Sequence, residues 1–320
     1  MPPRREHIAP NRNHEGAVMA DQKNEGRVPT MPPKKKKGRG KRVLIIVLLL
    51  ICVCSLGAAG IILFGYQQGE QSYEEVQTHF EVPDDPAVVM DASTPESPGA
   101  KLVDWSALRA INPDIVGWLY VPNTPINYPV MQGDDNDYYL HHDFYGSEGI
   151  VATYGSIYLA AENSPDFSDK NNVLFGHHLN NGTMFAAIAE YGDPAVFNDR
   201  RTSYLLTPQG NYQLRSFAVL HIASDDPIGQ LTFEDDQAYV DYLQNKIDRS
   251  EVPATDIPAP TEMDKTFVFS TCDNLFTNGR WALCNYVEKF VPTTAAGEGM
   301  PEEAVDAAQT AESGEAPAVE

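Results

Sequence analysis

The stretch Phe267-Val268-Phe269-Ser270-Thr271-Cys272 has the composition of a β-strand and ends in a cysteine, with Asp273-Asn274 directly after it. Aromatic and β-branched residues are enriched in strands, and side chains alternate between the two faces of a strand. Val268, Ser270 and Cys272 are therefore expected on one face. A thiol at a strand end is rigidly held yet accessible, which suits a nucleophile, although a lone cysteine in a strand is more often a buried apolar residue.

Seven further extended runs surround this one and are separated by turn residues such as Gly133-Asp134 and Asn278-Gly279. These runs are residues 117–121, 126–131, 156–159, 172–175, 203–206, 212–222 and 281–291. Many short strands with turn signals between them are typical of a β-sandwich or a β-barrel. Helical periodicity predicts three helices, at residues 105–111 after a cap at Asp104, at 183–191, and at 235–250 in the long connection before the cysteine strand.

Residues 43–64 contain no charged side chain and follow a basic cluster that includes Lys34-Lys35-Lys36-Lys37. A transmembrane helix needs roughly 20 apolar residues, and positive flanking charge stays on the cytoplasmic side. The sequence therefore predicts a single membrane span with the N-terminus in the cytoplasm and all later residues outside. A cleaved signal peptide fits less well, because its apolar core is shorter and lies nearer the N-terminus.

The net charge of −22 for the 320 residues is the sum of a basic N-terminal segment and an acidic remainder. Residues 1–42 read as a basic disordered cytoplasmic segment without the aromatic residues of a nucleic-acid-binding surface, and residues 65–102 read as an extracellular stalk. Residues 103–292 have the length of one folded domain. Residues 293–320 are expected to form an acidic disordered tail, because they contain almost no large apolar side chain.

Two more polar residues complete a candidate site with Cys272. The first lies in the pair His177-His178, which follows the apolar run 173–175 and Gly176, and an imidazole has the pKa needed for proton transfer near neutral pH. Arg280 lies eight residues after Cys272, so a hairpin would place its guanidinium beside the thiol, where it could stabilise an oxyanion. Each residue alone fits an ordinary surface position, but a cysteine with a histidine is the arrangement of covalent acyl transfer.

The chain has four cysteines, and Cys52 and Cys54 lie within the apolar segment. Cys272 and Cys284 do not make a disulfide framework for a domain of this size. Alternation from Arg280 places Cys284 on the same strand face as that arginine. A bond between Cys284 and Cys272 would remove the nucleophile, and its geometry cannot be judged from sequence.

At these residues the sequence resembles the sortases, and class B sortases in particular. The resemblance rests on Ser270-Thr271-Cys272 with Arg280, and on Leu174-Phe175-Gly176-His177-His178-Leu179 with Gly182-Thr183-Met184-Phe185. It continues upstream in Val116-Gly117-Trp118-Leu119, Ile126-Asn127-Tyr128-Pro129-Val130, Asn136-Asp137-Tyr138-Tyr139-Leu140 and Gly155-Ser156-Ile157-Tyr158-Leu159. It covers about residues 103–291 in the order found in the family.

The resemblance implies a mainly β fold, a closed eight-stranded barrel with N-terminal helices and a helix before the cysteine strand. It implies a transpeptidase that cleaves a C-terminal sorting signal after Thr and holds the acyl group as a thioester on Cys272. The acceptor would be an amine of cell-wall precursor or pilin, on the outer face of a Gram-positive cell membrane. By resemblance His177, rather than His178, and Arg280 complete the catalytic set. Peptide contacts are implied at Ser270, Phe175, Asn136, Leu140 and Asp273, with no cofactor, metal or nucleic acid.

Two rival interpretations are open. A Cys–His peptidase would release the acyl group to water instead of an amine. A non-catalytic surface protein would bind sorting peptides, or a metal through His141, His142, His177, His178, Cys272 and Cys284. The spacing of these six residues matches no compact zinc motif, which argues against a metal site.

Overall fold

The computed structural model describes residues 39–152, 154–275 and 278–293. The basic segment before residue 39 and the acidic tail after residue 293 lie outside the described residues. The chain divides into two compact units, with the boundary between Cys54 and Ser55.

Helix α1 (Arg39–Gln77) carries the apolar segment and continues beyond it. By length and composition it is able to cross a membrane. Its large apolar side chains at residues 43–64 are exposed, Leu44 and Leu63 by 58% and 67%. Exposed apolar surface of this extent is unfavourable in water, which makes the helix compatible with a membrane anchor.

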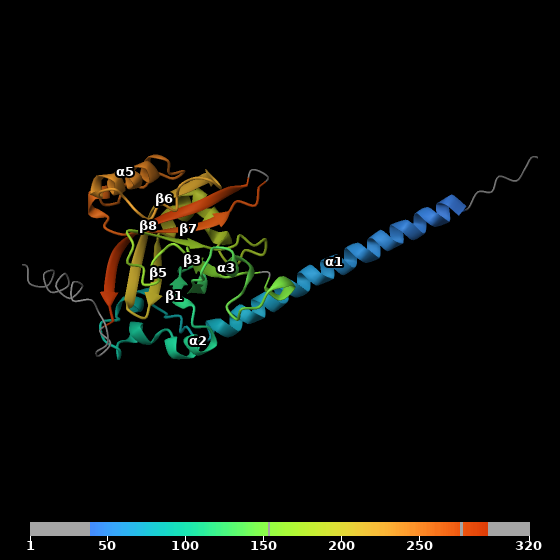
Figure 1. Cartoon of the computed structure of the whole chain (residues 1–320), viewed down its shortest axis with the longest axis horizontal. Coiled ribbons are helices and arrows are strands. Elements are labelled where there is room, and N and C mark those ends of the chain that lie inside the picture. The colour runs from blue at the N-terminus through green and yellow to red at the C-terminus, as the bar shows by residue number, and fades with distance from the viewer. Residues whose placement is uncertain (1–38, 153, 276–277, 294–320) are drawn as a thin grey trace, which may run out of the picture. The chain divides into compact units, whose positions relative to one another are not determined.

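Eight strands form a closed barrel in the order β1-β2-β3-β4-β7-β8-β6-β5 (Figure 1). The strands are β1 (Ile115–Tyr120), β2 (Asn127–Met131), β3 (Ile157–Leu159), β4 (Asn171–Phe175), β5 (Thr202–Thr207), β6 (Gly210–Ala223), β7 (Thr266–Cys272) and β8 (Gly279–Pro292). Strand β3 runs parallel to β2, and β7 runs parallel to β4. The eight runs read from the sequence are these eight strands, and the predicted barrel is confirmed.

The other helices lie before β1 and in the connections between strands. They are α2 (Trp105–Ile111), α3 (Tyr138–His141), α4 (Pro194–Asp199) and α5 (Asp236–Asp248), with 3₁₀ helices η1 (Pro86–Met90), η2 (Pro98–Lys101), η3 (Gly149–Ala152), η4 (Ala186–Gly192) and η5 (Pro260–Glu262). Asp104 caps α2 by accepting the N–H of Ala107, and Asp235 caps α5 by accepting the N–H of Ala238. The helix expected at 183–191 is the 3₁₀ helix η4.

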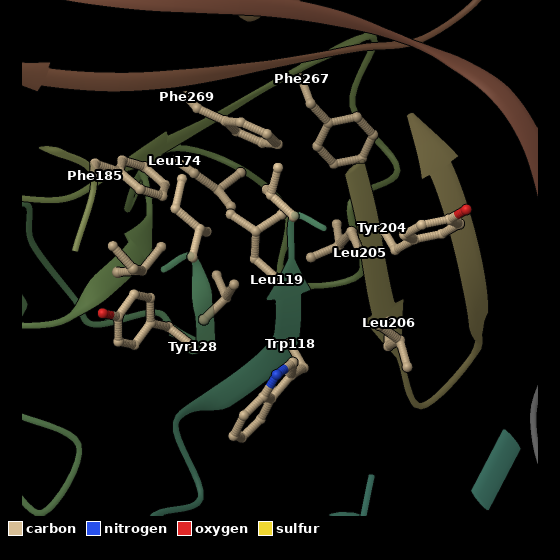
Figure 2. Packing of buried hydrophobic residues seen from close by; sticks show 14 of the residues in the cluster. Trp118, Leu119, Tyr128, Leu174, Phe185, Tyr204, Leu205, Leu206, Phe267 and Phe269 are labelled. Atoms are coloured by element: carbon tan, nitrogen blue, oxygen red, sulfur yellow. The ribbon is translucent and has the colours of Figure 1, made fainter. Parts of the chain in front are cut away.

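The two faces of β7 pack into different apolar clusters. Phe267 and Phe269 join the main core, where they meet Leu119, Leu174 and Phe185 (Figure 2). Val268 belongs to a second cluster, with Tyr239, Tyr242 and Leu243 of α5. This alternation confirms the expected separation of faces and leaves Ser270 and Cys272 on the face of Val268.

The segment expected as a stalk, residues 65–102, differs from that expectation because part of it packs on the barrel. Tyr73, Val76, Phe80 and Val89 are buried in the main core, and the Asn211 side-chain amide donates to the carbonyl of Val89 at 2.7 Å. These apolar residues are separated by several polar ones, so the average composition of the segment is that of a linker although individual side chains are buried.

Candidate active site

A cavity of about 390 Å³ lies where β4, β7 and β8 meet. Its lining residues are Asn136, Leu140, Tyr158, Phe175, Gly176, His177, Ser270, Thr271, Cys272 and Arg280. The structure therefore brings together all three side chains predicted to be catalytic. It also brings four of the five predicted peptide contacts to the same place, and the exception is Asp273.

Cys272 and Arg280 are placed by the β7–β8 hairpin. Cys272 is the last residue of β7 and is the direct cross-strand partner of Arg280, and the thiol residue is exposed. The Asp273 N–H donates to the carbonyl of Gly279 at 3.0 Å, which closes the hairpin just beyond the pair. The Arg280 guanidinium carbon lies 5.8 Å from the centre of the Phe175 ring, where a cation–π contact helps to hold it.

His177 follows the end of β4, and one of its ring nitrogens is already bonded. Nε2 lies 2.7 Å from the carbonyl oxygen of Leu140. A carbonyl only accepts, so Nε2 carries a proton and Nδ1 is the nitrogen free to exchange one with a reacting group. Burial lowers the pKa of His177, the Leu140 carbonyl opposes that shift, and His141 adds to it.

The strand ends that carry the thiol and the imidazole are tied to each other. Thr271 Oγ1 donates to the carbonyl of Gly176 at 2.8 Å. His178 Nδ1 lies 2.9 Å from the carbonyl of Cys272, and the Asn274 amide donates to the carbonyl of His178 at 2.8 Å. His178 thus binds the backbone of the cysteine strand, while His177 lines the cavity.

Four of the residues expected to contact a peptide line the cavity together with Tyr158, which the sequence analysis did not identify as a site residue. Tyr158 is the cross-strand partner of Phe175, and its hydroxyl donates to the carbonyl of Asn136 at 3.0 Å. Burial raises its pKa to about 12, so it is a neutral donor at physiological pH. Predicting Tyr158 as a cavity residue requires the register between β3 and β4, and the local sequence around Tyr158 does not give that register.

Ser270 differs from the other lining residues in the hydrogen bonding of its side chain. It is buried, and within the described part of the chain its Oγ has no hydrogen-bond partner. A buried hydroxyl without a partner costs free energy. The Ser270 hydroxyl is thus free to bond a group that enters the cavity.

Asp273 differs from the expectation of a peptide contact. Its side chain is 1% exposed, and Oδ2 lies 2.9 Å from Nε2 of His221. Oδ1 accepts the N–H of Leu275 at 2.9 Å. A carboxylate that follows a strand readily bonds the backbone two residues on, and here that local turn and the His221 partner direct it into the hairpin and away from the cavity.

Cys284 lies too far along the sheet to pair with Cys272. Its cross-strand partner is Val268, four residues before Cys272, which is about 13 Å at 3.3 Å per residue. Disulfides require much shorter Cα separations, and both thiols are free. Burial raises the pKa of Cys284 to about 12, which keeps it an unreactive thiol. Within residues 39–293 as described, no three His, Cys, Asp or Glu side chains are grouped to hold a metal ion.

Comparison with known proteins finds relatives of this chain. No protein-family model matches the sequence. The curated Sortase B of Listeria monocytogenes is 32% identical over 221 residues, which is 68% of this chain and 88% of the relative. A solved Staphylococcus aureus sortase B–substrate complex superposes with a TM-score of 0.59 at 26% identity, covering 71% of this chain and 99% of that one. Sortase B from B. anthracis in complex with AAEK1 has a TM-score of 0.59 at 26% identity, with 70% and 98% covered.

Proposed function

Because the chain belongs to the sortase B family and is therefore a cysteine transpeptidase, we propose that it cleaves the C-terminal sorting signal of surface proteins after a threonine. Cys272 is the nucleophile and carries the acyl group as a thioester. An amine of cell-wall precursor or pilin then accepts that group. The observation that carries this proposal is that Cys272, His177 and Arg280 line one cavity although they are far apart in sequence.

The first half-reaction forms the acyl-enzyme. The thiolate of Cys272 attacks the carbonyl carbon of the threonine, and the carbonyl oxygen becomes an oxyanion that accepts hydrogen bonds from the Arg280 guanidinium. Protonated His177 gives its Nδ1 proton to the departing amine as the C–N bond breaks. A thioester, a free amine and a neutral imidazole result.

The second half-reaction reverses these roles. The acceptor amine attacks the thioester carbonyl, and neutral His177 takes the proton that the amine loses as the new C–N bond forms. Arg280 again faces the oxyanion, and the C–S bond then breaks to return Cys272 as a thiolate. Protons and bonds balance without a metal or a redox partner.

Peptide binding is assigned to the wall formed by Phe175, Leu140, Ser270 and Asn136. Phe175 and Leu140 supply apolar surface, and the Ser270 hydroxyl lacks a partner among the described residues. The Asn136 amide already bonds Glu162 and the N–H of Ala161, which holds its backbone carbonyl in place beside Tyr158. The related S. aureus sortase B has been solved as a substrate complex, which supports proposing that this enzyme binds a substrate.

The exposed apolar part of α1 is proposed to anchor the enzyme in the membrane of a Gram-positive cell. The basic residues before it favour a cytoplasmic N-terminus and a catalytic domain on the outer side. An enzyme held there meets its substrates as they emerge from the membrane.

The test is mass spectrometry of the protein incubated with peptides that contain Thr-Gly, Thr-Asn or Thr-Ala, with and without an amine such as triglycine. We expect cleavage after threonine and, with the amine present, an amide product in place of the acid. Release of the acid alone, whatever the amine concentration, would support the rival peptidase. Absence of cleavage in every mixture would support the non-catalytic rival.

A further inference from the structure

The C-terminal end of α1 packs against the residues that surround the catalytic histidine. Tyr73, one turn before the helix ends at Gln77, is 3% exposed. Its ring stands edge-on to Tyr128 at 5.3 Å and stacks on Tyr154 at 6.0 Å. Its hydroxyl donates to the carbonyl of Gly155 and lies 3.3 Å from the hydroxyl of Ser156. The polar atom of this buried ring is thus directed at the segment 154–156.

Gly155 in turn lies against the imidazole of His177. A Cβ built on Gly155 would lie 2.9 Å from Cδ2 of His177 and 2.6 Å from the carbonyl oxygen of Leu140. The residue also has a φ of +54°, which glycine adopts without strain. Gly155 therefore contacts both the catalytic ring and the carbonyl that bonds its Nε2.

A second hydrogen bond ties this segment to the helix that carries Leu140. The N–H of Ser156 donates to the carbonyl of Tyr139 at 2.9 Å, and Tyr139 and Leu140 are neighbours in α3. A displacement of the segment 154–156 would therefore move the Leu140 carbonyl as well as the surface on which the imidazole rests.

We propose that Tyr73 is a positioning residue for His177, and that its hydroxyl fixes Gly155 so that Gly155 and Leu140 hold the imidazole in its working orientation. The helix that bears the membrane anchor thereby supplies part of the support of the active site. This inference rests on the proposed function, because it requires His177 to act in turnover.

The pH profile of kcat distinguishes a positioning role of Tyr73 from a role in packing alone. The Leu140 carbonyl favours protonated His177, whereas burial and the neighbouring His141 disfavour it. If Leu140 moves away, the pKa of His177 falls, and the limb of the kcat profile that reports this residue moves to lower pH. A loss of packing alone lowers stability and leaves that limb in place.

The experiment compares three variants of the full chain in detergent. Tyr73→Phe keeps the buried ring and removes the hydroxyl. Tyr66→Phe is the matched control, because its half-buried ring also packs on Tyr154 from α1, at 6.2 Å, without reaching Gly155 in any described hydrogen bond. His177→Ala reports whether the histidine acts in turnover at all. The measurements are kcat, KM for the sorting peptide, the pH profile of kcat, and Tm.

For Tyr73→Phe we expect kcat to fall by roughly threefold to a hundredfold, the upper value being the cost of a 1 Å misplacement. We expect the fall in kcat to exceed any rise in KM, because Leu140 is the one residue of the peptide-binding wall that the displaced segment moves, and we expect the His177 limb to shift to lower pH. Tyr66→Phe should match the parent protein.

Two results would overturn the inference. The first is an unchanged kcat and pH profile in Tyr73→Phe while His177→Ala is inactive. The second is a fall in kcat that accompanies a fall in Tm with the pH profile unmoved, which would make the role of Tyr73 structural only. Full turnover in His177→Ala would instead refute the proposed function.

Discussion

Cys272 and Arg280 are cross-strand partners in the hairpin formed by β7 and β8. Backbone pairing therefore sets the two residues side by side at the end of the hairpin. Side chains alternate with a period of two, so a slip of one residue in this register would move Arg280 to the opposite face. The placement of the proposed nucleophile beside the proposed oxyanion-stabilising cation thus follows from the strand pairing of the barrel.

Replacing this arginine tests its proposed part in the reaction. We expect Arg280→Ala to lower kcat by roughly 10²–10³, as loss of one oxyanion donor does in other acyl-transfer enzymes. Arg280→Lys should recover only part of the loss, because lysine keeps the charge but not the planar set of donors. Steady-state kinetics with Tm as the control for folding measure both, and a parental rate in Arg280→Ala would remove the residue from the mechanism.

The Ser270 hydroxyl offers a test of peptide binding that is separate from folding. In the free enzyme it forms no hydrogen bond within the described residues, so Ser270→Ala should leave Tm unchanged or raise it slightly. If the bound peptide supplies the missing partner, kcat/KM should fall by roughly twofold to tenfold, the value of one hydrogen bond. A lower Tm with unchanged kcat/KM would show that the hydroxyl stabilises the fold instead.

A buried ion pair holds α5 to the connection that precedes it. The Lys246 ammonium is 2% exposed, lies 3.6 Å from Asp226, and stacks over Tyr242, while Arg249 also bonds Asp226. Asp226→Ala leaves the lysine charge buried without its anion, so we expect a loss of about 3–5 kcal/mol in the free energy of unfolding.

The partner variant Lys246→Met should cost less, because methionine retains the packing of the lysine stem and Asp226 retains Arg249. Urea denaturation of both variants measures the difference. Equal losses, or a larger loss in Lys246→Met, would mean that packing rather than charge dominates at this position.

The lowered pKa of His177 also predicts how the stability of the protein depends on pH. Its pKa in the folded protein lies below the ordinary value, chiefly because of burial. The unfolded chain then binds more protons than the folded one as the pH falls below about 6.5, so the free energy of unfolding decreases in that range. In His177→Gln this contribution disappears, and the decrease below about pH 6.5 should be shallower. Urea midpoints across that range measure it, and parallel curves for the two proteins would contradict the shift.

Local patterns in the sequence were sufficient to predict the strands and the faces of the cysteine strand. Alternation in residues 267–272 separates Phe269 from Ser270 and Cys272 because one face of β7 meets the main core while the other meets α5 and the cavity. The closed barrel and the choice of His177 over His178 came from family resemblance, since β4 and β7 are distant in sequence and a parallel pairing leaves no local signal.

Contacts that depend on long-range register could not be predicted. Tyr158 enters the cavity wall only because it opposes Phe175, and the Leu140 carbonyl reaches His177 only because α3 folds back onto β3. Asp273 was expected to contact peptide, yet its partner His221 lies on β6, which pairs with β8 behind the hairpin. The buried residues of the 65–102 segment were missed because isolated apolar side chains do not change its average composition.

The most direct test of the account is intact-mass spectrometry of the enzyme trapped during turnover of a threonine-containing sorting peptide, followed by mapping of the modified residue. We expect an adduct on Cys272 with the mass of the peptide fragment that ends in threonine, released by hydroxylamine as a thioester is. The adduct should be absent from Cys272→Ala and present in Cys284→Ala. Turnover by Cys272→Ala, or an adduct that maps to Cys284, would contradict the account.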